Sequence, residues 1–381
     1  SGVLNGGLSN ADGTARTTLR PMVKAAVCRE FGAPLVVEEI EVSPPGPGEV
    51  RVTVKACAIC HSDIMLAEGS WGGVLPGVYG HEAAGEIESV GEGVDTVVVG
   101  DRVVISLIRS CGQCHACVSG IHPSCTGEFG IDSSAPLCGQ EGEAITHGLG
   151  TATFAEQAVV DASQVVKLPD DIPWASASML GCGVITGFGA VVNTAKIEAG
   201  SHVAVIGCGG VGINSLQGAA LAGARTVIAI DLEADKRDGA FEFGATHAVD
   251  PTAPDAVDDV KALTDGRGVD YAFVTVGAKP AIESAQWFVA AGGAVVIAGM
   301  TASGVNPEID TTMIADSSQR ILGSKMGSGR LAIDIPNLVD LYAQGRLKLD
   351  ELVSDTYSLD EINDAIASTK AGSARRNVII F

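Results

Sequence analysis

Positively charged residues are scarce in this chain of 381 residues, which has 24 lysines and arginines against 46 aspartates and glutamates. The formal net charge of −22 repels a phosphate backbone, so we expect no nucleic-acid partner. Long apolar runs are also missing, and without about 18 uninterrupted apolar residues a membrane span is not expected. Hydrophobic residues nevertheless make up 46% of the chain, which is enough for a large globular core.

A signal-peptide pattern is missing as well. Residues 1–20 are polar and lack a charged start followed by an apolar run, so we expect a flexible tail and a cytoplasmic protein. The ten cysteines are then better explained by metal binding than by disulfides. At roughly 150 residues per domain, the length predicts two or three domains.

The hydrophobic pattern changes near residue 185. Before it, Val-rich runs between turn signals predict an irregular β-barrel or sandwich, with strands at 22–28, 35–42, 49–58, 85–89, 101–107 and 154–160. After it, strands at 203–206, 226–230, 271–276 and 294–297 alternate with helices that end at 222 or span 236–243 and 281–290. This alternation predicts a parallel sheet with helices on both faces, and a further helix is expected at 335–344.

Four cysteines, Cys111, Cys114, Cys117 and Cys125, have the spacing C-x2-C-x2-C-x7-C. Structural Zn²⁺ prefers four ligands in a tetrahedron, and thiolates are common among them. Two intervening residues let a tight turn direct neighbouring sulfurs at one centre, and the longer last spacing closes the site. An iron–sulfur cluster and reduced core cysteines are the alternatives, but the spacing favours structural zinc.

A glycine-rich turn, Gly207-Cys208-Gly209-Gly210-Val211-Gly212, matches G-x-G-x-x-G between an expected strand and an expected helix. Gly207 permits the tight turn, Gly209 lets the backbone approach a pyrophosphate, and Gly212 permits close helix–strand packing. The helix amino terminus favours phosphate charge. The turn therefore predicts a dinucleotide site.

Asp231 ends the next expected strand, 19 residues after Gly212. A carboxylate there accepts hydrogen bonds from the adenosine ribose and repels a 2′-phosphate, which favours NAD over NADP. Lys236 is expected to assist at the ribose. Arg237 is an opposing signal because a nearby arginine accommodates a 2′-phosphate, and a helix N-cap is the alternative role of Asp231.

Three further potential metal ligands, Cys60, His81 and Cys182, lie far apart in the sequence. By residue type alone, an isolated cysteine or histidine is more often a core residue than a ligand.

From about residue 22 to residue 381, however, the chain resembles the zinc-containing medium-chain alcohol dehydrogenases. The order and spacing of six segments carry this resemblance: Gly80-His81-Glu82-Ala83-Ala84-Gly85, Val90-Gly91-Glu92-Gly93-Val94, Gly100-Asp101-Arg102-Val103, the four-cysteine loop, Gly181-Cys182-Gly183 and the glycine-rich turn. The resemblance implies an α/β protein with a GroES-like β-rich catalytic domain (21–183 and 326–381). It also implies a Rossmann domain with a doubly wound parallel sheet (184–325), and an active site in the cleft between the domains.

The same resemblance implies two zinc ions per chain, with Cys60, His81 and Cys182 as ligands of the catalytic one. It implies hydride transfer between a primary or secondary alcohol and NAD, with Ser62 accepting the alcohol proton. Asp63 is expected to orient the ligands, and Glu82 to lie near the metal.

Further roles are carried over residue by residue. The expected cofactor contacts beyond the glycine-rich turn, Asp231 and Lys236 are His61, Thr186, Val276 and Arg376. The expected substrate-pocket residues, each with a packing role as the alternative, are Trp71, Leu107 and Met300.

Two positions depart from many relatives. Met65 stands where they have the histidine that ends the proton relay, which leaves the outer part of that path unassigned. Ser62 replaces the threonine of some relatives, and the lost methyl favours bulkier or secondary alcohols.

The long stretch from Cys125 to Cys182 resembles the longer-looped branch, whose members tend to be dimers, so a homodimer is expected. The run from Gly210 to Ala219 resembles actinobacterial members. Some of those retain their nicotinamide, and others oxidise thiol adducts of formaldehyde, so both remain alternatives. A family member without catalytic zinc is a third alternative, against which the three retained ligands argue.

Overall fold

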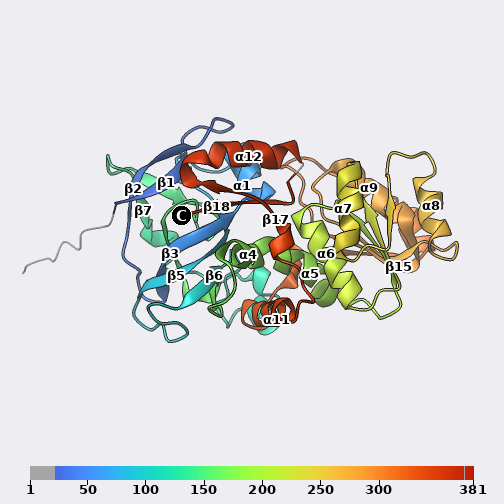
Figure 1. Ribbon diagram of the computed structural model, residues 1–381, viewed down its shortest axis with the longest axis horizontal. Helices are drawn as coiled ribbons and strands as arrows, with labels where there is room; N and C mark the ends of the chain where they lie inside the picture. The colour runs from blue at the N-terminus through green and yellow to red at the C-terminus, as the bar shows by residue number, and fades with distance from the viewer. Residues whose placement is uncertain (1–21, 373) are drawn as a thin grey trace, which may run out of the picture.

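The computed structural model describes residues 22–372 and 374–381, and the expected flexible tail, residues 1–20, lies outside them. The described chain forms a β-rich part and an α/β part that lie side by side along the long axis of the molecule (Figure 1). Residues from 22 to about 180 and the C-terminal segment make the β-rich part, so segments far apart in the sequence fold together.

The β-rich part contains a barrel and a seven-stranded sheet. The barrel runs β1 (Met22–Cys28), β2 (Val36–Val42), β7 (Leu137–Cys138), β8 (Ala144–His147) and β4 (Gly77–Val78). The sheet runs β10 (Val165–Lys167), β6 (Arg102–Ile105), β5 (Glu82–Val90), β3 (Glu49–Ala58), β18 (Arg376–Ile380) and β17 (Val353–Ser358), with β9 (Gln157–Asp161) also on β3. The strands expected at 22–28 and 49–58 are confirmed, whereas those expected at 101–107 and 154–160 are shorter or begin later.

The α/β part contains a six-stranded sheet in which every pairing is parallel. Its order is β13 (His247–Val249), β12 (Thr226–Ile230), β11 (His202–Ile206), β14 (Val269–Val274), β15 (Val289–Ile297) and β16 (Arg320–Gly323). The chain moves outward from β11 in one direction and then continues from β14 in the other. The carboxyl ends of β11 and β14 therefore form the switch point at which such sheets bind ligands.

Helices cover both faces of this sheet: α6 (Gly210–Leu221), α7 (Ala234–Ala240), α8 (Ala256–Ala262) and α9 (Lys279–Phe288). One apolar cluster packs around Leu216 of α6 and another around Phe288 of α9. The helix expected at 281–290 ends two residues earlier, because Val289 and Ala290 begin β15. Outside the sheet lie α2 (His115–Val118), α3 (Ile131–Ser134), α10 (Thr311–Asp316), α11 (Leu331–Ala343) and α12 (Ile362–Ala371).

A continuous helical segment, Trp174–Ala195, joins the two parts and includes α4 (Trp174–Met179) and α5 (Ile185–Gly189). The domain limit expected at 183/184 falls inside this segment. Among the described residues it is the one helix long and apolar enough to cross a membrane by length and composition. Of its most apolar window, 83% is buried inside the protein, which is the pattern of a core helix.

Two sets of hydrogen bonds hold the parts together. The Gln217 amide of α6 accepts from the backbone N–H of Lys348 at 2.8 Å and donates to its carbonyl at 3.0 Å. Elsewhere, the indole N–H of Trp71 donates to the carbonyl of Thr301 at 3.0 Å. The backbone N–H of Ser303 donates to the Ser70 carbonyl at 3.1 Å beside it.

Candidate functional site

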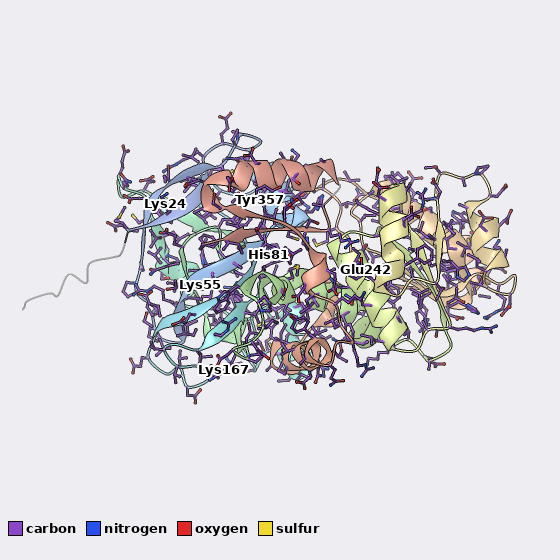
Figure 2. All side chains as sticks on the ribbon, viewed as in Figure 1. Lys24, Lys55, His81, Lys167, Glu242 and Tyr357 are labelled. Carbon is purple, nitrogen blue, oxygen red and sulfur yellow. The ribbon has the colours of Figure 1, made fainter. Side chains whose placement is uncertain are left out.

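Cys60, His81 and Cys182 come together with Glu82, and one ligand atom from each lies within 4.8 Å of the others. Cys60 caps α1 (His61–Ala67) just after β3, and His81 immediately precedes β5. Cys182 lies in the wide helical turn Leu180–Val184 that connects α4 to α5. Figure 2 shows His81 in the interior of the β-rich part, on the side that faces the parallel sheet.

The His81 imidazole is fully buried and held from one side. Its Nδ1 lies 2.8 Å from Oδ1 of Asp63, and the same oxygen accepts the backbone N–H of Gly80 at 2.9 Å. The other ring nitrogen, Nε2, is buried and has no hydrogen-bond partner among the described residues. An orphaned imidazole nitrogen beside two thiols fits the donor set of a zinc site with three protein ligands and an open position.

The Glu82 carboxylate lies beside the candidate metal ligands Cys60, His81 and Cys182, but it already has other partners. Oε2 accepts the backbone N–H of Gly183 at 3.1 Å, and Oε1 lies 3.2 Å from Nη2 of Arg376. Burial raises the pKa of Glu82 to about 8, against the opposing effect of the Arg376 charge. Arg376 also donates to the Ile59 carbonyl at 3.2 Å, so it ties β18 to the site.

The four-cysteine loop forms a second cluster, made by Cys111, Cys114, Cys117 and Cys125. The Cys111–Cys117 and Cys114–Cys125 sulfur pairs are both 3.9 Å apart. A tetrahedron with Zn–S bonds of about 2.3 Å has edges of about 3.8 Å, so the four sulfurs fit a closed zinc site.

Backbone amides prepare these sulfurs for a cation. The amides of Cys114, Cys117 and Gly127 point at the sulfurs of Cys111, Cys114 and Cys125, at 3.4, 3.5 and 3.3 Å. Amide donation from Thr126 and Cys117 lowers the pKa of Cys114 to about 5. A thiolate is thus favoured at Cys114 before metal binds, whereas burial raises the pKa of Cys125 to about 11.

The glycine-rich turn lies at the switch point of the parallel sheet, between β11 and α6. Gly207 has φ +91°, and a Cβ on Gly212 would stand 1.8 Å from the carbonyl oxygen of Gly207. A Cβ on Gly209 would meet nothing within 4 Å, so this position faces open space. The turn has the cradle shape that a pyrophosphate needs.

Asp231 directly follows β12 and reaches back to this turn. Its Oδ2 accepts the backbone N–H of Cys208 at 2.7 Å, and its Oδ1 accepts that of Glu233 at 3.0 Å. The carboxylate therefore stands at the carboxyl edge of the sheet, where an adenosine ribose would lie.

Other expected cofactor residues surround the turn. A Cβ on Gly210 would lie 2.4 Å from Nε of Arg376, and Arg376 also pairs with Glu82, so this cation stands between the α6 amino terminus and the candidate metal ligands. Partial desolvation lowers the pKa of His61, and the charges of Arg376 and Lys236 lower it further, so these cations gather at one place. This gathering of cations suits a pyrophosphate.

The other two expected cofactor residues are uncharged. The Thr186 hydroxyl lies 4.0 Å from the Cys182 sulfur, and Val276 packs against Gly207.

The expected pocket residues are less uniform. Leu107 packs against the apolar cluster that includes Cys60 and Cys182. The indole N–H of Trp71 donates to the Thr301 carbonyl, so Trp71 connects the two parts of the molecule. The side chain of Met300 is 63% exposed. Leu107 is thus the one of the three that packs beside the ligands, whereas Trp71 and Met300 lie towards the contact between the domains.

One neighbour of the site had no signal in the sequence. Met326 places its sulfur 3.7 Å from the Cys182 sulfur and 3.6 Å from the Thr186 hydroxyl. It belongs to a turn, Lys325–Ser328, in which Met326 has φ +48°. By residue type alone, a methionine near apolar residues is expected to be a core residue.

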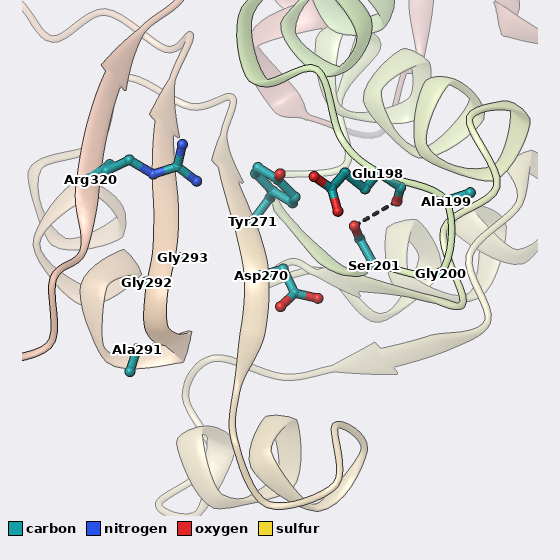
Figure 3. A pocket seen from close by; sticks show the side chains of 10 residues that line it. All are labelled: Glu198, Ala199, Gly200, Ser201, Asp270, Tyr271, Ala291, Gly292, Gly293 and Arg320. Carbon is teal, nitrogen blue, oxygen red and sulfur yellow. Dashed lines mark hydrogen bonds between the residues drawn. The ribbon is translucent and has the colours of Figure 1, made fainter.

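A separate cavity of about 330 Å³ lies elsewhere on the parallel sheet (Figure 3). Ser201, Asp270, Tyr271 and Arg320 line it, and they precede or begin β11, β14 and β16. These are the amino ends of the strands. The cavity is therefore at the opposite edge from the glycine-rich turn and is not part of the cofactor site.

Comparison with known proteins agrees with this geometry. Residues 46–170 match the alcohol dehydrogenase GroES-like domain, and residues 210–344 match the zinc-binding dehydrogenase family. An NDMA-dependent alcohol dehydrogenase of Amycolatopsis methanolica is 39% identical over 94% of this chain and 98% of its own length. A probable S-(hydroxymethyl)glutathione dehydrogenase of Schizosaccharomyces pombe is 38% identical over 93% and 96%.

The fold comparison reaches the same family. The crystal structure of benzyl alcohol dehydrogenase from Acinetobacter calcoaceticus is 32% identical and has a TM-score of 0.88, covering 95% of this chain and 99% of that one. The expected GroES-like and Rossmann fold class is confirmed, as are an enzyme of this class and its cofactors, zinc and NAD. The chain belongs to the zinc-containing medium-chain alcohol dehydrogenases.

Proposed function

We propose that Cys60, His81 and Cys182 hold the catalytic zinc, and that the glycine-rich turn and Asp231 hold NAD in the adjoining cleft. The observation that carries this proposal is Nε2 of His81, which is buried beside two thiols and has no hydrogen-bond partner in the part of the chain that the structure describes. Arg376 contacts both Glu82 and Gly210, so the metal ligands and the cofactor turn share one neighbour. The reaction is the interconversion of a primary or secondary alcohol with its aldehyde or ketone.

When bound, zinc and NAD supply a Lewis acid for the alcohol oxygen and a hydride acceptor. The chain supplies orientation and proton movement. Ser62, in the first turn of α1 beside Cys60, would accept the alcohol proton on its Oγ while its own hydroxyl proton passes on towards solvent. Asp63 keeps the proton of His81 on Nδ1, which leaves Nε2 as a donor to the metal. The contacts of Trp71 and Ser303 across the cleft help to keep water out.

The proposed substrate is a bulkier or secondary alcohol, because Ser62 takes less space than the threonine of some relatives. A panel of primary, secondary, aromatic and cyclic alcohols, each with NAD⁺ and NADP⁺, tests it. We expect turnover with NAD⁺ and a higher kcat/KM for the aromatic or secondary members than for ethanol. A higher kcat/KM for ethanol would contradict the proposal that Ser62 makes room for bulkier alcohols.

Two alternatives remain: a tightly retained nicotinamide, and a thiol adduct of formaldehyde as substrate, of the kind that the name of the Schizosaccharomyces pombe relative gives. Denaturing the purified protein and assaying released NAD(H) tests whether the nicotinamide is retained. One equivalent per chain supports a nicotinoprotein, and none supports free exchange. Activity on formaldehyde only in the presence of glutathione or another thiol supports the second alternative. Metal analysis tests the catalytic proposal itself, since a single zinc per chain, lost on Cys114→Ala, would contradict it.

A homodimer formed through β16 is proposed for the assembly. This strand is one edge of the parallel sheet, and Arg320, Ile321 and Gly323 are exposed on it. An exposed apolar edge strand is a template for pairing, and a second copy is the usual partner. Light scattering should give twice the chain mass, and Ile321→Lys should shift it towards the monomer.

A reducing compartment such as the cytoplasm suits this enzyme. None of the ten cysteines forms a disulfide among the described residues, and seven of them belong to the two proposed zinc sites. Oxidation would remove the thiolates that both sites require.

A further inference from the structure

Arg237 makes two hydrogen bonds and one ion pair at the carboxyl edge of the parallel sheet. Its Nη1 donates to the carbonyl oxygens of Asp231 at 2.7 Å and Leu232 at 2.9 Å, directly after β12. Its Nη2 pairs with Oδ2 of Asp250 at 3.1 Å, directly after β13. The side chain is 18% exposed, so α7 delivers this cation to the turn that carries Asp231 without leaving it free in solvent.

Asp250 is itself fixed. Its Oδ1 accepts the hydroxyl of Thr252 at 2.7 Å and the backbone N–H of the same residue at 2.8 Å. These bonds, the hydroxyl first, lower the pKa of Asp250, and the charge of Arg237 adds to the effect. Asp250 is therefore a permanent carboxylate that neutralises the guanidinium.

We propose that Arg237 positions Asp231 for NAD, and that Asp250 withholds the Arg237 guanidinium from a 2′-phosphate. The inference rests on the proposed role of Asp231 at the adenosine ribose. Arg237 fixes the backbone of Asp231, and the Asp231 carboxylate in turn fixes the Cys208 amide of the glycine-rich turn. An arginine beside this acid, which by sequence favours NADP, is thereby converted into a part of the NAD site.

Two features then favour NAD over NADP. The carboxylate of Asp231 repels a 2′-phosphate, and the cation that would bind that phosphate is occupied elsewhere. Removing Asp231 alone should therefore weaken NADH binding without creating a good NADPH site. Releasing Arg237 as well should create one, because a charge-assisted hydrogen bond to phosphate then becomes available.

The test uses fluorescence titration of NADH and NADPH on the full-length enzyme with four variants. They are Asp231→Gly, Asp231→Gly/Asp250→Asn, the same double variant with Arg237→Met, and the control Asp231→Gly/Asp265→Asn. Asp265 is an acid of the same domain that lies 3.6 Å from Arg225 and does not contact Arg237. Thermal unfolding of each variant reports whether it is folded.

We expect Asp250→Asn to lower the Kd for NADPH about tenfold in the Asp231→Gly background, with the Kd for NADH unchanged. Arg237→Met should abolish that gain, and Asp265→Asn should produce none. An equal NADPH Kd in Asp231→Gly and Asp231→Gly/Asp250→Asn overturns the inference alone, as does a gain that survives Arg237→Met. An NADH Kd unaffected by Asp231→Gly contradicts the ribose role itself, and the inference falls with it.

Discussion

Asp63 lies 2.8 Å from Nδ1 of His81, and both side chains are almost completely buried. The two residues come from different elements, α1 and the segment before β5, so this bond forms only in the folded chain. It fixes the orientation of the imidazole and leaves Nε2 directed at the thiols. A histidine held in this way would need no rearrangement to bind zinc.

Asp63→Asn should weaken the catalytic zinc site while leaving the other site intact. The amide is isosteric, but it lacks the charge that holds the His81 proton on Nδ1. Loss of such a partner typically costs about 10–100-fold in metal affinity or activity. Metal analysis during chelator titration checks this, and the four-cysteine zinc in the same molecule is the control. Equal loss of both ions would contradict it.

Cys182→Ala and Cys114→Ala should separate catalysis from folding. Cys182→Ala should abolish turnover and retain one zinc and a near-normal Tm, because the four-cysteine site is elsewhere. Cys114→Ala should destabilise the fold by more than about 4 kcal/mol, since a structural zinc contributes folding energy directly. Cys138→Ala, outside both clusters, is the matched control for thermal unfolding and zinc content. Similar unfolding of both test variants would remove the distinction.

Gly209→Ala and Gly212→Ala should fail in different ways. A Cβ at Gly212 would stand 1.8 Å from the Gly207 carbonyl, so this variant should lower Tm and bind no NADH. A Cβ at Gly209 meets nothing within 4 Å, so that variant should fold normally yet bind NADH at least about tenfold more weakly, because the methyl occupies the space of the pyrophosphate. Unchanged NADH affinity in Gly209→Ala would place the pyrophosphate elsewhere.

His147 should make the protein sensitive to mild acid. Burial lowers its pKa to about 4, and its Nε2 is buried without a partner among the described residues. The unfolded value is about 6.5, so the folded state favours the neutral ring. Its contribution to stability is complete above about pH 6.5 and is lost as the pH falls towards about 4.

His147→Gln should therefore flatten the fall of Tm across this window by about one proton taken up on unfolding. His115→Gln, at an exposed position, is the control. Parallel Tm profiles for wild type and His147→Gln would assign the acid sensitivity to other groups.

Local spacing predicted the parts of this protein that are contiguous in the chain. The four cysteines between 111 and 125 form one cluster, and G-x-G-x-x-G lies between β11 and α6 as expected. Strand–helix alternation predicted the parallel sheet. Each of these patterns depends on a turn or a periodicity that a short segment establishes by itself.

Tertiary structure decided everything that joins distant segments. Cys60, His81 and Cys182 converge because β3, β5 and the helix from Trp174 pack together, and no local pattern in the sequence reports that convergence. The side chain of Arg237 illustrates the same limit. Its sequence position suggests a 2′-phosphate ligand, but its direction depends on Asp250, 13 residues further on and at the end of another strand. The sequence by itself determined which groups are available and the turns that hold them. The packing of the two domains decided which groups meet, because burial and pairing of charges are properties of the assembled core.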